Sequence, residues 1–235
     1  MRAVFVLVHS PAVGPLTWRP VARELRERGH EAIVPSLLDA VAAGPPYWPR
    51  VVDAVRQAVE GVNAPLVAVC HSGAGPYAPA LASSLGGRLA ATVFADALLP
   101  AESGSSPLAT PRQLGFLRDL ADDEGLLPPW TSWFDERHIA PMFPDPAQRR
   151  AVEAEQPRLP LAYFEARIPV PAAWHGHPCF YLRFSPAYAE AAEEARRRGW
   201  PVADLPGTHL HQLTAPGAVA ARLLTVLPRV TPPAS

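Results

Sequence analysis

Short apolar runs alternate with amphipathic stretches over the first hundred residues, and this alternation constrains the fold more than any other feature. Val4 to Val8 is rich in β-branched residues, which is typical of a strand buried on both faces. From Leu16 to Arg28 apolar side chains share one helical face, and Gly29 is placed to stop that helix. Further apolar runs lie at 31–35, 66–70 and 89–95, separated by helical patterns at 51–62 and 73–85. The alternation predicts an α/β fold with a mostly parallel, doubly wound sheet covered by helices.

The pattern changes between residues 100 and 177. This stretch is rich in proline and has only short helical patterns, such as those at 111–120 and 147–156. It also contains large aromatic side chains, in which disordered segments are poor; they are Trp130, Trp133, Phe134, Phe143, Tyr163, Phe164 and Trp174. We therefore predict a helical lid over residues 100–177, inserted into a core formed by residues 1–99 and 178–235.

The predicted core resumes after the insertion. Apolar runs at 179–184 and 201–205 predict strands, and the patterns at 187–198 and 216–227 predict helices. We find no internal repeat in the sequence.

Composition narrows the classes of function. The 235 residues carry 21 basic and 22 acidic side chains, and without a basic stripe a nucleic-acid partner is disfavoured. The sequence has no lysine, so Schiff-base chemistry and a phosphate-loop lysine are excluded. Cys70 and Cys179 are too few for a disulfide scaffold. No apolar run is long enough for a signal peptide or a membrane span of about 20 residues, so we expect a cytoplasmic protein with no membrane partner.

The clearest chemical signal is the stretch Leu66-Val67-Ala68-Val69-Cys70-His71-Ser72-Gly73-Ala74-Gly75. A buried strand runs into a serine flanked by small residues, and a helix follows directly. Such a sharp turn forces the Ser72 hydroxyl outward at the carboxyl end of the sheet, where the backbone N–H of Gly73 is free to meet an oxyanion. Taken alone, a serine in such a turn is more often a helix cap.

With this turn the sequence resembles the α/β-hydrolase superfamily, in its serine-nucleophile branch. The nucleophile elbow of that family has the pattern Gly-x-Ser-x-Gly, and here Cys70 and Ala74 stand at the two glycine positions, both small enough for the turn. The family also carries a histidine after its last strand, and Gly207-Thr208-His209 matches its Gly-x-His pattern. The resemblance implies that Ser72 is the nucleophile and His209 the general base. His211 is the weaker candidate for the base.

The acid of the expected triad is not where the family usually carries it. That position follows the strand at 179–184, where Ser185-Pro186-Ala187 contains no acid. Some family members, such as certain haloalkane dehalogenases, carry the acid after an earlier strand, and here Asp96 closes the apolar strand at 89–95. Because a buried lone carboxylate needs a partner, we predict that Asp96 orients His209. The fallback acids are Asp204 and Glu190.

The loop after the first strand resembles the oxyanion loop of the hydroxynitrile lyase and methylesterase branch. His9-Ser10-Pro11-Ala12-Val13-Gly14 aligns without gaps with the His-Gly or His-Thr loop of that branch, and Trp18 falls on a tryptophan that the branch also carries. In the family the residue two positions after the histidine donates its backbone N–H, but Pro11 has none. The second donor is therefore the Ala12 N–H or the Ser10 hydroxyl, or the oxyanion hole is weak.

The remaining expectations concern ligands. We assign to the substrate pocket His9, His71, Trp130, Trp133 and Phe134. Aromatic side chains facing the pocket favour a small apolar substrate. His175-Gly176-His177 lacks a third ligand at metal spacing, so we expect no metal, and acyl-enzyme chemistry requires no cofactor. The oligomeric state stays open, with a homo-oligomer as one option.

Three functions are compatible with the sequence. The favoured one is a serine hydrolase that cleaves a carboxylic ester or a related acyl bond through an acyl-enzyme. A lyase or cyclase that uses Ser72 and His209 as acid and base is the first alternative, favoured by the missing N–H at Pro11. A non-catalytic ligand-binding module is the second, and it gains weight if Asp96 lies far from His209.

Overall fold

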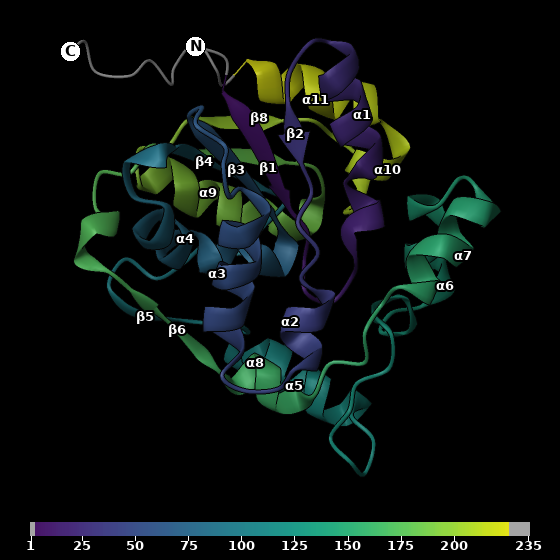
Figure 1. Cartoon of the computed structure of the whole chain (residues 1–235). Coiled ribbons are helices and arrows are strands. Elements are labelled where there is room, and N and C mark those ends of the chain that lie inside the picture. Colours follow the sequence, from purple (N-terminus) through teal and green to yellow (C-terminus); the bar gives the residue numbers. More distant parts are fainter. Residues whose placement is uncertain (1–2, 226–235) are drawn as a thin grey trace.

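The computed structural model describes residues 3–225 and is built around a six-stranded sheet (Figure 1). The strands are β1 (Val4–Val8), β2 (Ala32–Ile33), β3 (Leu66–His71), β4 (Leu89–Ala95), β7 (Cys179–Arg183) and β8 (Val202–Asp204). Their spatial order is β2-β1-β3-β4-β7-β8, and every neighbouring pair is parallel. The predicted α/β fold with a parallel, doubly wound sheet is confirmed. Because the strand order reverses between β1 and β3, the loops after these two strands meet where such folds bind ligands.

Helices cover both faces of this sheet (Figure 1). The helices α1 (Arg19–Glu27) and α11 (Pro216–Leu224) pack on one face, and α3 (Tyr47–Ala58), α4 (Ala78–Leu85) and α9 (Ala189–Arg197) pack on the other. Along β1, Phe5 and Leu7 share an apolar cluster with α1 and α11, while Val4, Val6 and Val8 share one with α3, α4 and α9. All five side chains are buried, and burial on both faces explains why the strand has a continuous apolar run instead of an alternating one.

Several predicted helices begin or end differently in the structure. The helix predicted at 73–85 starts as a 3-10 helix, Ser72–Tyr77, and becomes α4 only at Ala78. Pro76 has no N–H to donate, which favours the irregular first turns. The helix predicted at 16–28 likewise begins with a 3-10 turn, Pro15–Thr17, and the one predicted at 51–62 begins earlier, at Tyr47. The short helices α2 (Leu38–Ala42) and α10 (His211–Thr214) were not predicted.

The segment between β4 and β7, where the sequence predicts a helical insertion at residues 100–177, contains short helices and, in addition, a pair of strands that was not predicted. Its helices are α5 (Pro111–Leu120), α6 (Glu136–Ile139), α7 (Pro146–Ala154) and α8 (Leu161–Glu165). It also contains β5 (Gly104–Pro107) and β6 (Arg167–Val170), which pair antiparallel. Figure 1 shows α5 and α8 together below α2 and α3, and α6 and α7 at the side of the molecule.

Two sequence expectations lie partly beyond the described residues. The last helix is predicted to run to residue 227; in the structure it ends at Leu224, and residues 226 and 227 lie outside the described part of the chain. Among residues 3–225, no helix combines the length and apolarity needed to cross a bilayer.

Candidate active site

The carboxyl ends of β3 and β4 carry two residues in an uncommon backbone conformation. Ser72 has φ +54° and Asp96 has φ +44°, and within the described chain these are the non-glycine residues with positive φ. Such a conformation costs of order 1–3 kcal/mol and persists only where the surrounding structure enforces it. Strained residues cluster at functional sites, so the two outliers single out the adjacent ends of these strands.

Close packing enforces the turn that carries Ser72. The Ser72 carbonyl accepts a hydrogen bond from the N–H of Leu98, 3.1 Å away, which ties the turn to the chain that follows β4. A Cβ atom on Gly75 would lie 1.8 Å from the carbonyl oxygen of Leu98, so no larger residue fits there. Cys70 and Ala74, at the two positions where the hydrolase family has glycine, are fully buried. The position at which only glycine fits is therefore Gly75, one residue after the second glycine position of the family pattern.

Ser72, His209 and Asp96 form a continuous hydrogen-bonded row. His209 Nε2 lies 3.0 Å from Ser72 Oγ, and His209 Nδ1 lies 2.8 Å from Asp96 Oδ2. A carboxylate only accepts hydrogen bonds, so Nδ1 carries the proton and Nε2 is left to accept the serine hydroxyl. This arrangement can move the serine proton to the imidazole while the carboxylate stabilises the resulting cation. The structure therefore brings together the three residues that the sequence proposed as a triad.

The loop after β7 holds the Asp96 carboxylate in place. Oδ1 accepts the backbone N–H groups of Phe184 and Ser185 at 2.9 and 3.0 Å, and Oδ2 accepts the Ser185 hydroxyl at 2.6 Å. Burial by itself would raise the pKa of Asp96, but the hydrogen bonds from His209 and Ser185 and the charge of His209 lower it below the ordinary value. The buried carboxyl group therefore stays ionised and can orient the imidazole.

Three aromatic rings surround the His209 imidazole. The ring centroids of His71, Tyr188 and Trp130 lie 4.6, 4.9 and 5.9 Å from that of His209. His71 also donates its Nε2–H to the backbone carbonyl of His209 at 3.0 Å, which fixes the loop on which the imidazole stands. Only 11% of the His209 side chain is exposed, so its contacts with Ser72 and Asp96 compete little with water.

Tyr188 is a site residue that the sequence analysis missed. Its hydroxyl lies 3.1 Å from Ser72 Oγ. It follows β7 in the 3-10 turn Pro186–Tyr188, on the same loop as Ser185. No motif marks either residue, and the one available signal was the loop itself, because the family usually places its acid there.

On the candidate oxyanion loop, the Ser10 side chain lies against Gly73. A Cβ atom on Gly73 would be 3.3 Å from Ser10 Oγ. The Ala12 N–H donates to the same Ser10 Oγ at 3.4 Å, so this amide is directed at Ser10 and is not free to bind an oxyanion. Of the alternatives that the missing N–H of Pro11 left open, the geometry favours the Ser10 hydroxyl as the donor beside Gly73.

His9 and His71 were assigned to the substrate pocket, and the structure buries both. His9 Nε2 accepts the N–H of Leu37 at 3.0 Å, and its Nδ1 donates to the Ser10 carbonyl at 2.8 Å. Burial lowers the pKa of His9 to about 4 and that of His71 to about 3, so both are neutral near pH 7. Their contacts are with the protein, and they fix the loops that carry Ser10 and His209.

The aromatic side chains of the inserted segment divide between two environments. Trp130 is buried beside His209. Phe134 packs edge-on against Trp130 with ring centroids 6.0 Å apart, and it is 45% exposed. Trp133 instead donates its indole N–H to the Pro128 carbonyl at 2.7 Å and packs against Phe164. Trp130 is therefore the member of this group that reaches the candidate site.

The fallback residues lie outside this hydrogen-bonded row. Asp204 accepts a hydrogen bond from Arg183 at 2.6 Å, and Glu190 is exposed. His211 pairs through Nδ1 with the Thr214 hydroxyl at 3.0 Å. Within residues 3–225 no group of three or more His, Cys, Asp or Glu side chains is arranged to hold a metal ion.

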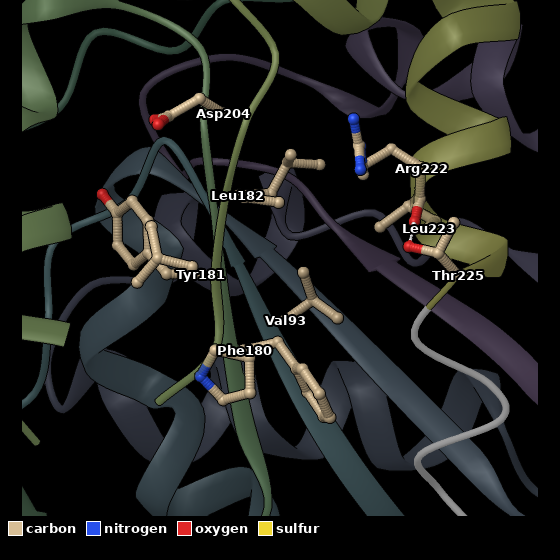
Figure 2. Close-up of a pocket in the computed structure, with 11 residues that line it drawn as sticks. Val93, Phe180, Tyr181, Leu182, Asp204, Arg222, Leu223 and Thr225 are labelled. Carbon is tan, nitrogen blue, oxygen red and sulfur yellow. Dashed lines mark hydrogen bonds between the residues drawn. The ribbon is translucent and has the colours of Figure 1, made fainter. Parts of the chain in front are cut away.

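A surface pocket of about 260 Å³ has none of Ser72, Asp96 and His209 in its wall (Figure 2). Figure 2 shows it bounded by side chains of β4, β7, β8 and α11, among them Val93, Phe180, Leu182, Asp204, Arg222 and Leu223. This pocket therefore does not open onto the candidate nucleophile.

Comparisons with known proteins agree with the fold. A family model described as "Alpha/beta hydrolase family" matches residues 5–222. An extracellular alpha/beta-hydrolase from a Paenibacillus species, described as sharing structural and functional homology with tobacco salicylic acid binding protein 2, is 18% identical with a TM-score of 0.74, over 95% of this chain and 98% of that one. A pyrethroid hydrolase from Sphingobium faniae is 16% identical with a TM-score of 0.73, over 96% and 97% of the two chains.

A variant of tomato methylketone synthase I, complexed with beta-ketoheptanoate, is 13% identical with a TM-score of 0.75, over 98% of this chain and 99% of that one. No curated protein sequence matches the chain. At these identities the solved structures support the fold, and they leave the reaction to be argued from the site.

Proposed function

The chain belongs to the alpha/beta hydrolase family, and we propose that it is a serine hydrolase that cleaves a carboxylic ester or a related acyl bond through an acyl-enzyme. The observation that carries the proposal is the row of hydrogen bonds from Ser72 through His209 to Asp96, at 3.0 and 2.8 Å. Nucleophile and base within hydrogen-bond reach, with the base oriented by a third group, are what covalent acyl transfer requires.

In the proposed reaction Ser72 attacks the carbonyl carbon while His209 takes its proton. His209 then returns the proton to the leaving group, and water releases the acyl group by the same steps in reverse. Asp96 holds the imidazole in the required tautomer and stabilises its cation. We assign the oxyanion to the N–H of Gly73 and the hydroxyl of Ser10, which takes the place of the N–H that Pro11 lacks.

We further propose that residues 100–177 act as a lid and that the substrate is small and apolar. Trp130, from this segment, lies with its ring 5.9 Å from that of His209, which supports an apolar or aromatic group beside the nucleophile. Hydrolases and esterases occur among the structural neighbours, including one described as polyneuridine aldehyde esterase, at 13% identity. That likeness favours an ester in general and does not select one.

Covalent labelling tests the proposed mechanism. A fluorophosphonate probe should form an adduct on Ser72, located by peptide mass spectrometry, and Ser72→Ala should abolish it. His209→Ala should slow labelling by at least about 100-fold, because general-base catalysis contributes that much. Wild-type protein that turns over a substrate while Ser72 stays unlabelled contradicts the acyl-enzyme.

A lyase or cyclase is the second candidate, and the proline at position 11 favours it. With one backbone donor missing, the site stabilises a tetrahedral oxyanion less than a complete oxyanion hole does. Ser72 and His209 would then act as acid and base without a covalent intermediate, so activity would be lost in Ser72→Ala although the wild type takes no label. A non-catalytic binding module has less support. It would be favoured by an Asp96 far from His209, but Asp96 Oδ2 lies 2.8 Å from His209 Nδ1.

A further inference from the structure

Tyr188 touches a reacting atom, yet the triad mechanism makes no use of it. Its hydroxyl lies 3.1 Å from Ser72 Oγ. Its ring stacks on the His209 imidazole, with centroids 4.9 Å and planes 7° apart. The loop after β7 therefore supplies both the Ser185 anchor for Asp96 and a phenol beside the nucleophile.

The tautomer of His209 determines the direction of the hydrogen bond between Tyr188 and Ser72. His209 donates Nδ1–H to Asp96, so its Nε2 accepts the proton of Ser72. The serine oxygen then offers a further partner only lone pairs, which makes Tyr188 the donor and Ser72 Oγ the acceptor. Burial raises the pKa of Tyr188 well above its ordinary value, so the phenol keeps its proton wherever His209 can act as a base.

Tyr188 reaches Ser72 Oγ from the side of the general base. The phenol and the imidazole are nearly parallel, and both end at the same oxygen, at 3.1 and 3.0 Å. The oxyanion donors assigned above, Gly73 and Ser10, belong to other segments. In the tetrahedral intermediate the leaving-group oxygen must lie next to His209 Nε2, which protonates it. That oxygen consequently comes within reach of the Tyr188 hydroxyl.

We propose that Tyr188 is a catalytic residue that donates a hydrogen bond to the leaving-group oxygen during acylation, and so adapts the site to esters of weakly acidic alcohols. This inference rests on the proposed serine hydrolase function. It adds a hydrogen-bond donor to the two oxyanion donors, Gly73 and Ser10. It also specifies the chemical class of the alcohol half of the substrate.

The proposed step balances without further reactants. The Ser72 O–H bond breaks, its proton moves to His209 Nε2, and Oγ bonds to the carbonyl carbon, whose π electrons move to the oxyanion. On collapse, the bond to the leaving oxygen breaks, and the electron pair of that bond takes the proton from His209. Tyr188 keeps its own proton and stabilises the charge that develops on the leaving oxygen. This charge needs most help when the leaving group is an alkoxide and least when it is p-nitrophenolate.

The test compares two esters with the same acyl group, ethyl butyrate and p-nitrophenyl butyrate. Tyr188→Phe removes the hydroxyl and keeps the stacked ring. It should lower kcat/KM, which reports on acylation, by about 10–100-fold for the ethyl ester and by less than about threefold for the p-nitrophenyl ester. Tyr163→Phe is the matched control, because the Tyr163 hydroxyl is buried and bonds Tyr77 instead of Ser72. In the control the ratio between the two esters should stay at its wild-type value.

Replacing Tyr188 by 3-fluorotyrosine supplies a second variant that keeps both ring and hydroxyl. Its more acidic phenol is a stronger donor, so kcat/KM for the ethyl ester should rise relative to that for the p-nitrophenyl ester. Equal losses on both esters in Tyr188→Phe, or an unchanged ratio in the fluorinated enzyme, overturn the leaving-group role while the wild type still hydrolyses and labels. A wild type that hydrolyses neither ester and takes no fluorophosphonate label instead overturns the proposed function itself.

Discussion

The hydroxyl of Ser185 donates to the carboxylate of Asp96 at 2.6 Å, across the ends of the neighbouring strands β7 and β4. The family usually carries its acid on the loop after β7. In this chain the acid stands after β4, and the loop after β7 binds it through one hydroxyl and two backbone N–H groups. In this chain the carboxylate and its anchor thus come from neighbouring strand ends, and the carboxylate still bonds to His209.

Ser185→Ala should lower the free energy of unfolding by about 1.5–3 kcal/mol, because it removes a hydrogen bond to a buried charged group. Urea denaturation at pH 7 measures the change. Ser106→Ala is the matched control, because Ser106 is also buried and its hydroxyl oxygen accepts only a neutral backbone N–H, from Ala101. It should cost less, about 0.5–1.5 kcal/mol. Equal losses in the two variants would show that the Ser185 bond gains nothing from the charge of Asp96.

Asp96→Asn should lower kcat by about 10³–10⁴-fold with little change in the fold, because an amide can donate to Nδ1 and stabilise the wrong imidazole tautomer. Steady-state kinetics on any hydrolysed ester measures it. Asp204→Asn serves as the control, since the Asp204 carboxylate pairs with Arg183 near the surface. A loss in Asp204→Asn as large as that in Asp96→Asn would remove Asp96 from the proposed triad.

The parts of the fold and of the candidate site that could be predicted from the sequence are those that depend on local residue patterns. The sheet could be predicted because strands buried on both faces are apolar throughout, as β1 is. Ser72 could be proposed because small residues mark a sharp turn, and Asp96 because a lone acid ends an apolar strand. The structure brings both to His209.

What the sequence could not indicate depends on contacts between distant segments. Ser185 and Tyr188 meet Asp96 and Ser72 only because the loop after β7 folds over the end of the sheet, and no periodicity encodes that path. The β5–β6 pair was missed for a related reason. Each strand has four residues and includes a proline, which leaves no alternating pattern to detect, and the pairing joins Ser105 to Pro169 far along the chain.

Acidification should destabilise the fold below about pH 6.5, because buried neutral histidines must take up protons on unfolding. Burial lowers the pKa of His9 to about 4, of His71 to about 3 and of His177 to about 4, so the unfolded chain binds more protons than the native one as the pH falls from 6.5. Each contributes a slope of up to about 1.4 kcal/mol per pH unit between 6.5 and its lowered pKa.

Other groups titrate in a different range or in the opposite direction. The pKa of Asp96 is lowered, so its stabilisation is present above the unfolded value of 3.8 and is lost only below it. Burial raises the pKa of Glu155, which opposes the histidines by favouring the native state as the pH falls toward 4.5. Urea denaturation between pH 8 and 5 measures the sum, and a free energy of unfolding that stays constant over this range would contradict the predicted neutral histidines.

Gly75→Ala should destabilise the fold by about 3 kcal/mol or more and abolish activity, because the new methyl group would lie 1.8 Å from the backbone oxygen of Leu98. Backbone cannot move aside as a flexible side chain does, so the turn that carries Ser72 must shift. Gly87→Ala is the control, since its Cβ would meet nothing within 4 Å and its φ is not positive, and it should change stability by less than about 1 kcal/mol. Thermal unfolding and fluorophosphonate labelling of both variants measure the two effects. A stable, fully labelled Gly75→Ala protein would mean that the turn tolerates a side chain and that its strained serine is held by other contacts.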